Sequence, residues 1–189
     1  MAHADTAITG FSGGNTFETV NGGPVTVGFE FTANANMSVT SLGVYNASAF
    51  GEPLQNSHEV GIWDAGGTLL GSVVVTNSDS LSDSFYYASI SPVSLQSGDN
   101  YFVGAFFDNN DWYDSGNSTV SSSAGITYIG GTYMDGGSLS DPTTVGFTNN
   151  GRFGPNFQYT VSATPEPGSL ALLGTGLIAL AGLRRRLVR

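Results

Sequence analysis

The sequence predicts an all-β protein: an antiparallel, jelly-roll-like β-sandwich followed by a single short transmembrane helix at the C-terminus. Three observations lead to this prediction. Apolar and polar residues alternate in short segments, glycine-rich turns separate those segments, and an uncharged apolar run stands near the end of the chain. Alternation with a period of two indicates a half-buried strand. Short strands at regular spacing between glycine-rich turns favour a sandwich.

The first clear strand is expected over residues 24–32, where Val and Phe alternate with Thr, Gly and Glu. The next strand is expected over residues 37–46, after a turn at 33–36. Its apolar phase changes near Ser41, which indicates a β-bulge.

A hairpin follows, because residues 59–64 and 69–76 flank a turn at 65–68 with two adjacent glycines. Glycine adopts positive φ at no steric cost, which suits a tight hairpin turn. We expect Trp63 to alternate with Ile62 and to lie in the sandwich core. The remaining strands are expected in 85–90, 101–107, 125–134 and 153–163, with turns at 97–100 and 135–137.

The body is strongly acidic and lacks both cysteine and lysine. Residues 1–164 contain 14 acidic residues and one basic residue, Arg152, which gives a formal net charge of −13. Nucleic-acid binding needs a basic surface, so nucleic acid is excluded as an expected partner. Without cysteine, disulfides and thiolate chemistry are excluded as well. Aromatic residues make up 12% of the chain, which argues for a folded core.

The C-terminal tail has a different composition. Residues 169–183 form an uncharged run of 15 residues, and 4 of the 5 basic residues occupy the last six positions, including Arg184, Arg185 and Arg186. As a helix the run spans about 22 Å, which is short for a hydrocarbon core of about 30 Å. A buried C-terminal helix is the alternative. The arginines favour a membrane segment whose basic end lies on the cytoplasmic side.

Pro165, Glu166 and Pro167, the apolar run and the arginine cluster follow one another in order. Together they resemble the PEP-CTERM sorting signal of Gram-negative bacteria. This resemblance implies an inner-membrane exosortase as processing partner, cleavage near the Pro-Glu-Pro triplet, and export, often in connection with exopolysaccharide. The arginines would then be the membrane stop of a transient anchor, and the mature form would be at the cell surface or extracellular.

We expect three parts in the chain. Residues 1–4 contain Ala2-His3-Ala4, a pattern like a signal-peptidase site, and are expected to be a signal-peptide remnant or start region. Residues 5–163 are expected to form the sandwich, and residues 164–189 the sorting and anchor segment.

Residues 20–107 carry a second resemblance. The strand pair up to Tyr45, the hairpin with Trp63 and Asp64, and the turn before Tyr101 are similar to a domain-of-unknown-function family of secreted bacterial β-sandwich modules. This resemblance implies an extracellular accessory or binding module and supplies no catalytic residues. It leaves residues 108–148 without an assigned role.

Few residues suggest catalysis. Ser12 lies in a G-x-S-x-G string, but a strand-like segment follows where a nucleophile elbow needs a helix. A serine triad would need His58, which we expect at the surface or the start of a strand. Glu30, Glu59 and Asp64 are the carboxylates available for glycoside hydrolysis, and Glu30 and Glu59 are expected to face solvent.

The stretch after Phe107 combines Asp108, Asp111 and Asp114 with Trp112 and Tyr113. Clustered oxygen ligands suit Ca²⁺, although this is not an EF-hand pattern. A Trp-Tyr platform with acidic neighbours also suits stacking on a sugar ring. The third alternative is a polar loop whose Trp112 packs back on the core.

These observations favour a non-catalytic exported surface or extracellular-matrix protein associated with exopolysaccharide or biofilm. The alternative is a polysaccharide-active hydrolase or a lectin-like carbohydrate-binding module. Calcium is the one cofactor that the sequence suggests.

Overall fold

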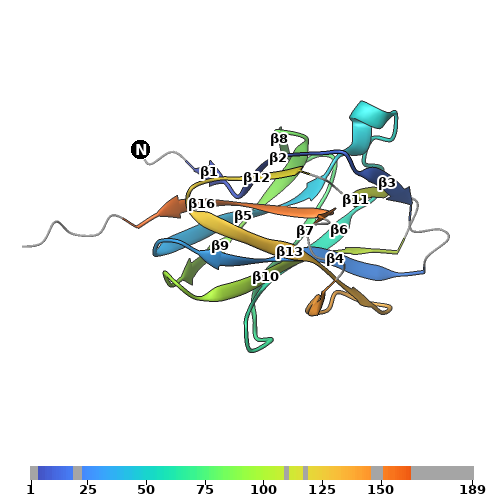
Figure 1. Cartoon of the computed structure of the whole chain (residues 1–189). Coiled ribbons are helices and arrows are strands. Elements are labelled where there is room, and N and C mark those ends of the chain that lie inside the picture. Colours follow the sequence, from blue (N-terminus) through green and yellow to red (C-terminus); the bar gives the residue numbers. More distant parts are fainter. Residues whose placement is uncertain (1–3, 19–22, 109–110, 117–118, 146–150, 163–189) are drawn as a thin grey trace, which may run out of the picture.

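The computed structural model describes residues 4–18, 23–108, 111–116, 119–145 and 151–162. Within these ranges the chain forms β-strands and one short 3-10 helix, η2 (Ala47–Phe50). Two large antiparallel sheets enclose a shared apolar core (Figure 1). The predicted all-β sandwich is therefore confirmed, while the jelly-roll description stays a prediction.

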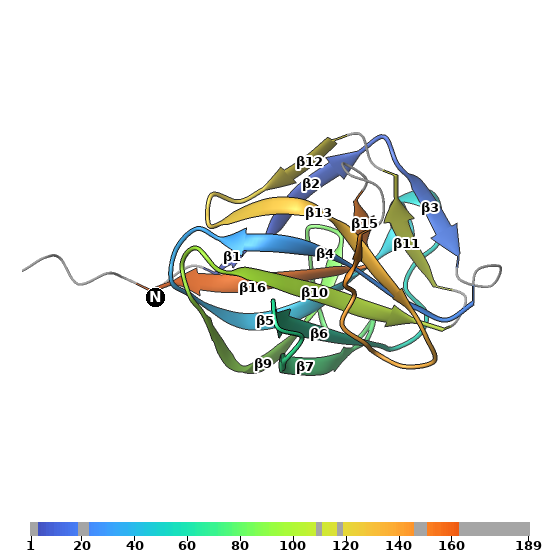
Figure 2. The same cartoon turned by 60° about the horizontal axis from the view of Figure 1, so that its bottom comes forward.

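The larger sheet has six strands, and the bulky residues of its central strand β4 point inward. Val27, Phe29 and Phe31 are fully buried, as the alternating pattern predicted. Figure 2 shows β4 between β13 and β10. In spatial order the strands are β14 (Thr144–Val145), β13 (Ile126–Asp135), β4 (Val25–Ala33), β10 (Asn100–Phe107), β6 (His58–Asp64) and β7 (Leu69–Val75).

The second sheet has five strands and brings the two ends of the domain together. The N-terminal strand pairs with the last one, with Asp5 opposite Tyr159. In spatial order the strands are β1 (Asp5–Thr6), β16 (Pro155–Val161), β5 (Met37–Tyr45), β9 (Phe85–Leu95) and β8 (Ser80–Ser82). In Figure 1 the N-terminal end and the end of β16 lie on one side of the molecule, and β3 and β11 lie on the opposite side.

Two small sheets complete the domain. One contains β15 (Arg152–Phe153), β11 (Trp112–Ser115) and β3 (Asn15–Glu18). The other contains β12 (Thr119–Ser122) and β2 (Ile8–Ser12). The region 108–148, to which the second resemblance assigned no role, supplies β11, β12, β13 and β14, and β13 corresponds to the strand expected over 125–134.

The main core joins the inner faces of both large sheets. Phe31 of β4 and Phe157 of β16 have ring centroids 4.8 Å apart. A second, smaller cluster contains Tyr45, Ala47, Phe85 and Tyr87, with Phe11 and Trp112 packed against it. Burial of this apolar area is the main favourable contribution to folding.

Local predictions from glycine and phase changes are confirmed. The pairing of β5 with β9 shifts register between Val39 and Ser41, where the bulge was expected. Strands β6 and β7 are joined by the predicted turn, in which Gly67 has φ 82°. The turn at 97–100 likewise contains Gly98 at φ 90°.

The prediction for Trp63 is wrong in one respect. Ile62 lies in the core, but neighbouring residues of a strand point to opposite faces, so Trp63 lies on the outer face of the sheet. It is still only 4% exposed, because it lies over Gly61 together with Leu139. The segment before β14 covers this face, and Ser140 N donates to Thr26 Oγ1 at 3.1 Å.

The predicted C-terminal helix, the sorting triplet Pro165–Pro167, the arginines 184–186 and the start residues 1–3 lie outside the described residues. Among the residues that are described, no helix has the length and apolar character needed to cross a bilayer.

Candidate functional site

A pocket of 540 Å³ lies at the end of the sandwich where β5 ends and β9 begins. Its walls come from residues 8–14, from Tyr45, from residues 83–85 and from Asp114. Pockets for small ligands measure roughly 300–1,000 Å³. The size and the mixture of aromatic and polar groups therefore suit a small polar ligand.

Three aromatic rings form the apolar part of the pocket. The centroids of Phe11 and Tyr45 lie 5.3 Å apart, those of Phe11 and Phe85 6.3 Å, and those of Tyr45 and Phe85 5.4 Å. The rings are inclined to one another by 55° to 77°. Phe11 also stacks on Phe153 of the main core at 4.4 Å. Phe11 therefore connects the three rings to the main core.

The polar part centres on Asp114 and Tyr45. Strand alternation places Asp114 on the same side of β11 as Trp112, which packs against the small aromatic cluster. Asp114 is only 3% exposed. Burial, together with the nearby charge of Asp114, raises the pKa of Tyr45 to about 12. The Tyr45 hydroxyl consequently keeps its proton at neutral pH and remains a hydrogen-bond donor.

A strained turn brings the remaining polar groups to the rim. Ser82 and Phe85 pair across a two-residue turn, in which Asp83 has φ 47° and Ser84 has φ 68°. Two positive φ angles are typical of a type I′ hairpin turn, whose twist matches that of the strands. Asn46 N donates to Ser84 O at 2.8 Å and ties the turn to the end of β5. Asp83 is exposed and lies at the mouth of the pocket.

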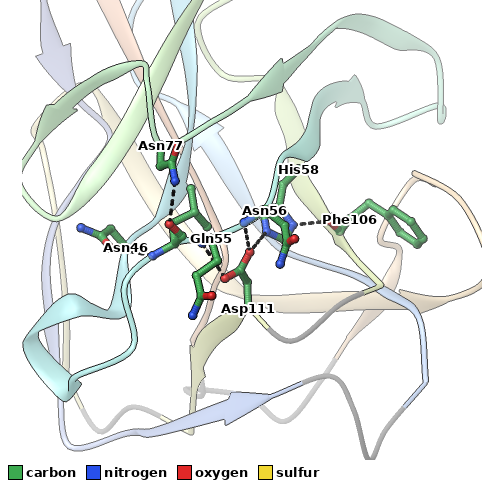
Figure 3. A network of polar contacts seen from close by, with 8 residues as sticks. Asn46, Gln55, Asn56, His58, Asn77, Phe106 and Asp111 are labelled. Carbon is green, nitrogen blue, oxygen red and sulfur yellow. Dashed lines mark hydrogen bonds and ion pairs between the residues drawn. The ribbon is translucent and has the colours of Figure 1, made fainter.

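A second polar arrangement lies outside this pocket and is buried (Figure 3). His58 Nε2 lies 3.0 Å from Asp111 Oδ2, and His58 Nδ1 lies 2.9 Å from the carbonyl oxygen of Phe106. Both neighbours are acceptors, so satisfying them requires a proton on each ring nitrogen. The geometry therefore fits an imidazolium paired with a carboxylate.

Asp111 also holds a loop. The backbone N–H groups of Gln55 and Asn56 donate to its two carboxylate oxygens at 2.8 and 2.7 Å. Burial acts to raise the pKa of Asp111, but the hydrogen bonds from His58, Gln55 and Asn56 and the charge of His58 outweigh burial and leave that pKa lowered. The loop is fixed further where Leu54 N donates to Asn46 Oδ1 at 3.0 Å.

The family of the body follows from comparison with known proteins. Residues 14–158 match the family described as domain of unknown function (DUF4082), which is more than half of the chain. The chain belongs to the DUF4082 family. Residues 163–186 match the PEP-CTERM protein-sorting motif. The chain therefore consists of a DUF4082 body followed by a C-terminal PEP-CTERM sorting motif. This motif marks the chain as an exported protein that an exosortase processes and sorts to the surface. The searches of curated proteins and of solved structures found no match.

Within the DUF4082 domain, His58 begins strand β6, which is one of the two positions expected for it, and it does not lie at the surface. Its side chain is 0% exposed because it packs inward, with its ring centroid 4.3 Å from that of Phe107. The sequence around His58 could not predict its burial, because the carboxylate that pairs with it, Asp111, is 53 positions away.

The predicted calcium ligands of the DUF4082 domain are not gathered in one place. Asp108 is exposed, Asp111 bonds His58, and Asp114 lines the pocket. Among the described residues, no group of three or more acidic or histidine side chains is arranged to hold a metal ion. Calcium binding remains a prediction without a geometric site to support it.

The predicted Trp-Tyr platform is split by strand alternation. Trp112 packs against the small aromatic cluster, whereas Tyr113 packs against the main core with its ring 5.5 Å from Phe107. The two rings therefore do not present one continuous surface. Of the three alternatives for this stretch, the structure favours a Trp112 that packs back on apolar residues.

The other candidate residues of the DUF4082 domain are dispersed. Ser12 ends β2 and lines the pocket, and strand β3 follows it in place of a helix. Glu30 accepts a hydrogen bond from Asn100 Nδ2 at 3.0 Å, and Glu59 is exposed. Asp64 accepts from Gly66 N and Thr68 N, and these bonds, that from Thr68 first, lower its pKa. Asp64 thus closes the hairpin turn.

The pocket itself was missed by sequence reasoning. Phe11, Tyr45 and Phe85 look like ordinary strand residues in the sequence, and Asp83 looks like a turn residue. Tertiary pairing alone brings them together with Asp114. The one signal in the sequence was the G-x-S-x-G string around Ser12, which lines the pocket. It does not form a nucleophile elbow, because a strand follows it in place of a helix.

Proposed function

We propose that this protein is a non-catalytic extracellular module that binds polysaccharide through the pocket at Tyr45 and Asp114. The proposal includes a role at the cell surface or in the extracellular matrix, in association with exopolysaccharide or biofilm. The observation that carries it is the combination of aromatic walls, a buried carboxylate and a protonated Tyr45 hydroxyl in one concavity. Sugars are recognised by such combinations, since ring C–H groups contact aromatic side chains and hydroxyls bind polar groups.

The non-catalytic part of the proposal is supported by the position of His58. Ser12 lines the pocket, but among the described residues no histidine lines it with Ser12. His58 is fully buried and bonded to Asp111 and Phe106, so it is placed to hold a loop. A serine hydroxyl becomes an effective nucleophile when an adjacent base such as histidine activates it.

The tail supports transient attachment to the inner membrane. In this proposal the apolar run 169–183 enters the bilayer and Arg184–Arg186 remain on the cytoplasmic side. The triplet Pro165–Pro167 stays at the outer face, where two prolines favour an extended segment that a peptidase can bind. Cleavage there separates the DUF4082 domain from its anchor.

A binding experiment with the exported protein tests the proposal. The protein purified from the culture medium should be retained by polysaccharide isolated from the same cultures, and the variant Gly10→Leu should be retained less. Gly10 lines the pocket, and a Cβ there meets no atom within 4 Å, so a leucine fills space without a backbone clash. Gly136→Leu is the matched control, because Gly136 is equally open and lies in a distant loop. Equal retention of both variants would contradict the pocket as the binding site.

A polysaccharide hydrolase is the second candidate, because two carboxylates, Asp83 and Asp114, line the same pocket. Glycosidases use a pair of carboxylates on opposite sides of the scissile bond. The same protein is incubated with the polysaccharide and new reducing ends are measured. Release of reducing ends that is abolished by Asp114→Asn would establish the hydrolase and remove the non-catalytic proposal.

A further inference from the structure

We infer that two copies of this chain associate edge to edge, each contributing strand β7 to one continuous antiparallel sheet. The inference is independent of the proposed polysaccharide binding. Strand β7 is the outermost strand of the larger sheet and pairs with β6 on one side. Among the described residues no strand pairs with its other side, and Figure 2 shows β7 at the margin of the molecule. An unpaired edge presents N–H and C=O groups that can bind another strand.

The other outer strands of the two large sheets are poorly suited to such pairing. Strands β14 and β1 have two residues each, and β8 has three. Strand β9 continues beyond β8 but contains Pro92 and a register shift, and β13 continues beyond β14 but shifts register between Tyr128 and Gly130. Short strands, bulges and proline protect sheet edges. Strand β7 has none of these features over residues 71–75, where its pairing with β6 is regular.

Strand β7 is uncharged although the body is strongly acidic. Residues 65–78 contain no charged side chain. The acidic residue that faces β7 in the ladder with β6 is Glu59, which lies opposite Val74. In a pair of copies the two Glu59 residues are three strand spacings apart, about 14 Å at the closest. This separation exceeds the Debye length of about 8 Å at physiological ionic strength. A second copy can therefore approach this edge without placing carboxylates opposite one another.

The exposed side of β7 is apolar. Val74 is 54% exposed and Leu69 is 49% exposed, although both are large hydrophobic residues. The inner side of the strand is closed by β9, since a Cβ placed on Gly71 would lie 3.1 Å from the Val93 side chain. Contacts between β-branched side chains on neighbouring strands stabilise an antiparallel pair. A second β7 therefore removes part of this apolar surface from water.

The same features make β7 complementary to itself. Two identical antiparallel strands are related by a two-fold axis, so every contact in their interface occurs twice. Ser72 is the central residue of the strand, and it is exposed on the same face as Val74. A two-fold axis near Ser72 therefore places small or apolar uncharged residues opposite one another, and it joins the two six-stranded sheets into one.

The mass of the exported protein in solution tests the inference. Sedimentation velocity from about 1 to 100 μM should show a reversible change from one chain to two as the concentration rises. Ser72→Glu puts like charges at the centre of the paired strands and should raise the dissociation constant at least about tenfold. Ser121→Glu makes the same change in charge at an exposed residue of β12 and should leave the dissociation constant unchanged.

A covalent test uses the absence of cysteine from the chain. Ser72→Cys and Val74→Cys, mixed and mildly oxidised, should form disulfide-linked dimers. Opposite residues of an antiparallel pair have Cα atoms about 4.5–5.5 Å apart, and disulfides span about 4.4–6.8 Å. The mixture detects a two-fold axis at residue 72, 73 or 74. Ser121→Cys should remain a single chain under the same conditions. The cysteine variants remain informative if Ser72→Glu fails to fold.

The outcomes decide between this edge and other surfaces. A single-chain mass at every concentration overturns the inference, and so does an equal change in Ser72→Glu and Ser121→Glu. A dimer that persists unchanged in Ser72→Glu, or that fails to cross-link at positions 72 and 74, is held together by another surface and also overturns it. A dimer that Ser72→Glu weakens, that Ser121→Glu leaves unchanged and that cross-links at these positions supports the inference.

Discussion

At the scale of single residues, the His58–Asp111 pair shows how a polar contact can fix an irregular loop. The carboxylate accepts hydrogen bonds from one imidazole and two backbone N–H groups, and it lies in the connection from β10 to β11. Buried N–H groups that lose their acceptor cost about 1–3 kcal/mol each. The Asp111 carboxylate thus adds two backbone anchors at Gln55 and Asn56 to a loop that Leu54 also fixes through its hydrogen bond to Asn46 and its burial in the core.

Replacing Asp111 by Asn should lower the free energy of unfolding by about 1–3 kcal/mol. The amide nitrogen cannot accept the bond that one carboxylate oxygen accepts, and the charge opposite His58 is lost. Urea denaturation followed by tryptophan fluorescence measures the change. Glu59→Gln is the control, because Glu59 is exposed next to His58, and it should change stability by less than about 0.5 kcal/mol. Similar stability of Asp111→Asn and the unmodified protein would contradict the role assigned to this pair.

The same pair predicts a pH dependence. The pKa of Asp111 is lowered in the folded state, so its contribution is present above the unfolded pKa of about 3.9 and is lost as the pH falls through the folded pKa. Between these two values the unfolded state binds more protons, and stability decreases with acidification. Melting temperatures measured from pH 6 to pH 2.5 should fall less steeply below about pH 4 in Asp111→Asn. Asp141, whose pKa is raised by burial and by Asp64, is present in both proteins and cancels in this comparison. Parallel profiles of the two proteins would refute the assignment.

At the scale of elements, the alternation of apolar residues was enough to predict the central strands, because each buries one face. Val27 and Phe29 of β4 illustrate this, and the bulge near Ser41 was visible as a change of phase. Alternation did not predict that the segment before β14 covers the outer face of the larger sheet, where it buries Trp63. It also could not find the pocket, because Phe11 and Asp114 are brought together by pairings between distant segments.

The β8–β9 hairpin carries a stability prediction of its own. Ser84 adopts φ 68°, which costs energy for a residue with a Cβ atom. Ser84→Gly should therefore stabilise the protein by about 0.5–1 kcal/mol. Thermal unfolding measures the shift. Ser121→Gly is the matched control in strand β12, where a glycine only adds flexibility and should destabilise by a similar amount. A decrease in stability for both substitutions would show that the turn is not strained.

At the scale of the whole molecule, the two ends of the sandwich differ: the chain leads into the sorting motif at one end, and the pocket lies at the other. The end of β16 lies at Met37 of β5, and Ser162 N donates to Asn36 O at 2.9 Å. The pocket lies at the other end of β5, which is nine residues long and spans about 25–30 Å. The sorting motif begins at residue 163, directly after the folded sheet. The chain thus leaves the domain at the end remote from the pocket.

Processing at the motif predicts the mass of the mature protein. The form recovered from the extracellular fraction should lack the apolar run 169–183 and the arginines that follow, because we propose that the exosortase cleaves near Pro165–Pro167. Intact-mass spectrometry measures this directly. A variant in which Arg184, Arg185 and Arg186 are replaced by Ser should accumulate as unprocessed chain, since the membrane stop is lost. Finding the complete tail on the extracellular protein would defeat the proposed cleavage.

The position of the pocket predicts how the precursor faces its surroundings before cleavage. Residues 163–168 reach at most about 20 Å even when fully extended, so an anchored domain keeps its β16 end close to the bilayer and its pocket end away from it. The chain contains no cysteine, so single cysteines can report accessibility without a background. Ala49→Cys marks the pocket end, where η2 follows β5, and Asp99→Cys marks the opposite end; both residues are exposed. In cells without exosortase activity, a bulky impermeant maleimide should modify Ala49→Cys several-fold faster than Asp99→Cys, and the two rates should become equal in the released protein. Faster modification of Asp99→Cys in the anchored form would mean that the pocket faces the membrane, where an extracellular polysaccharide could not reach it.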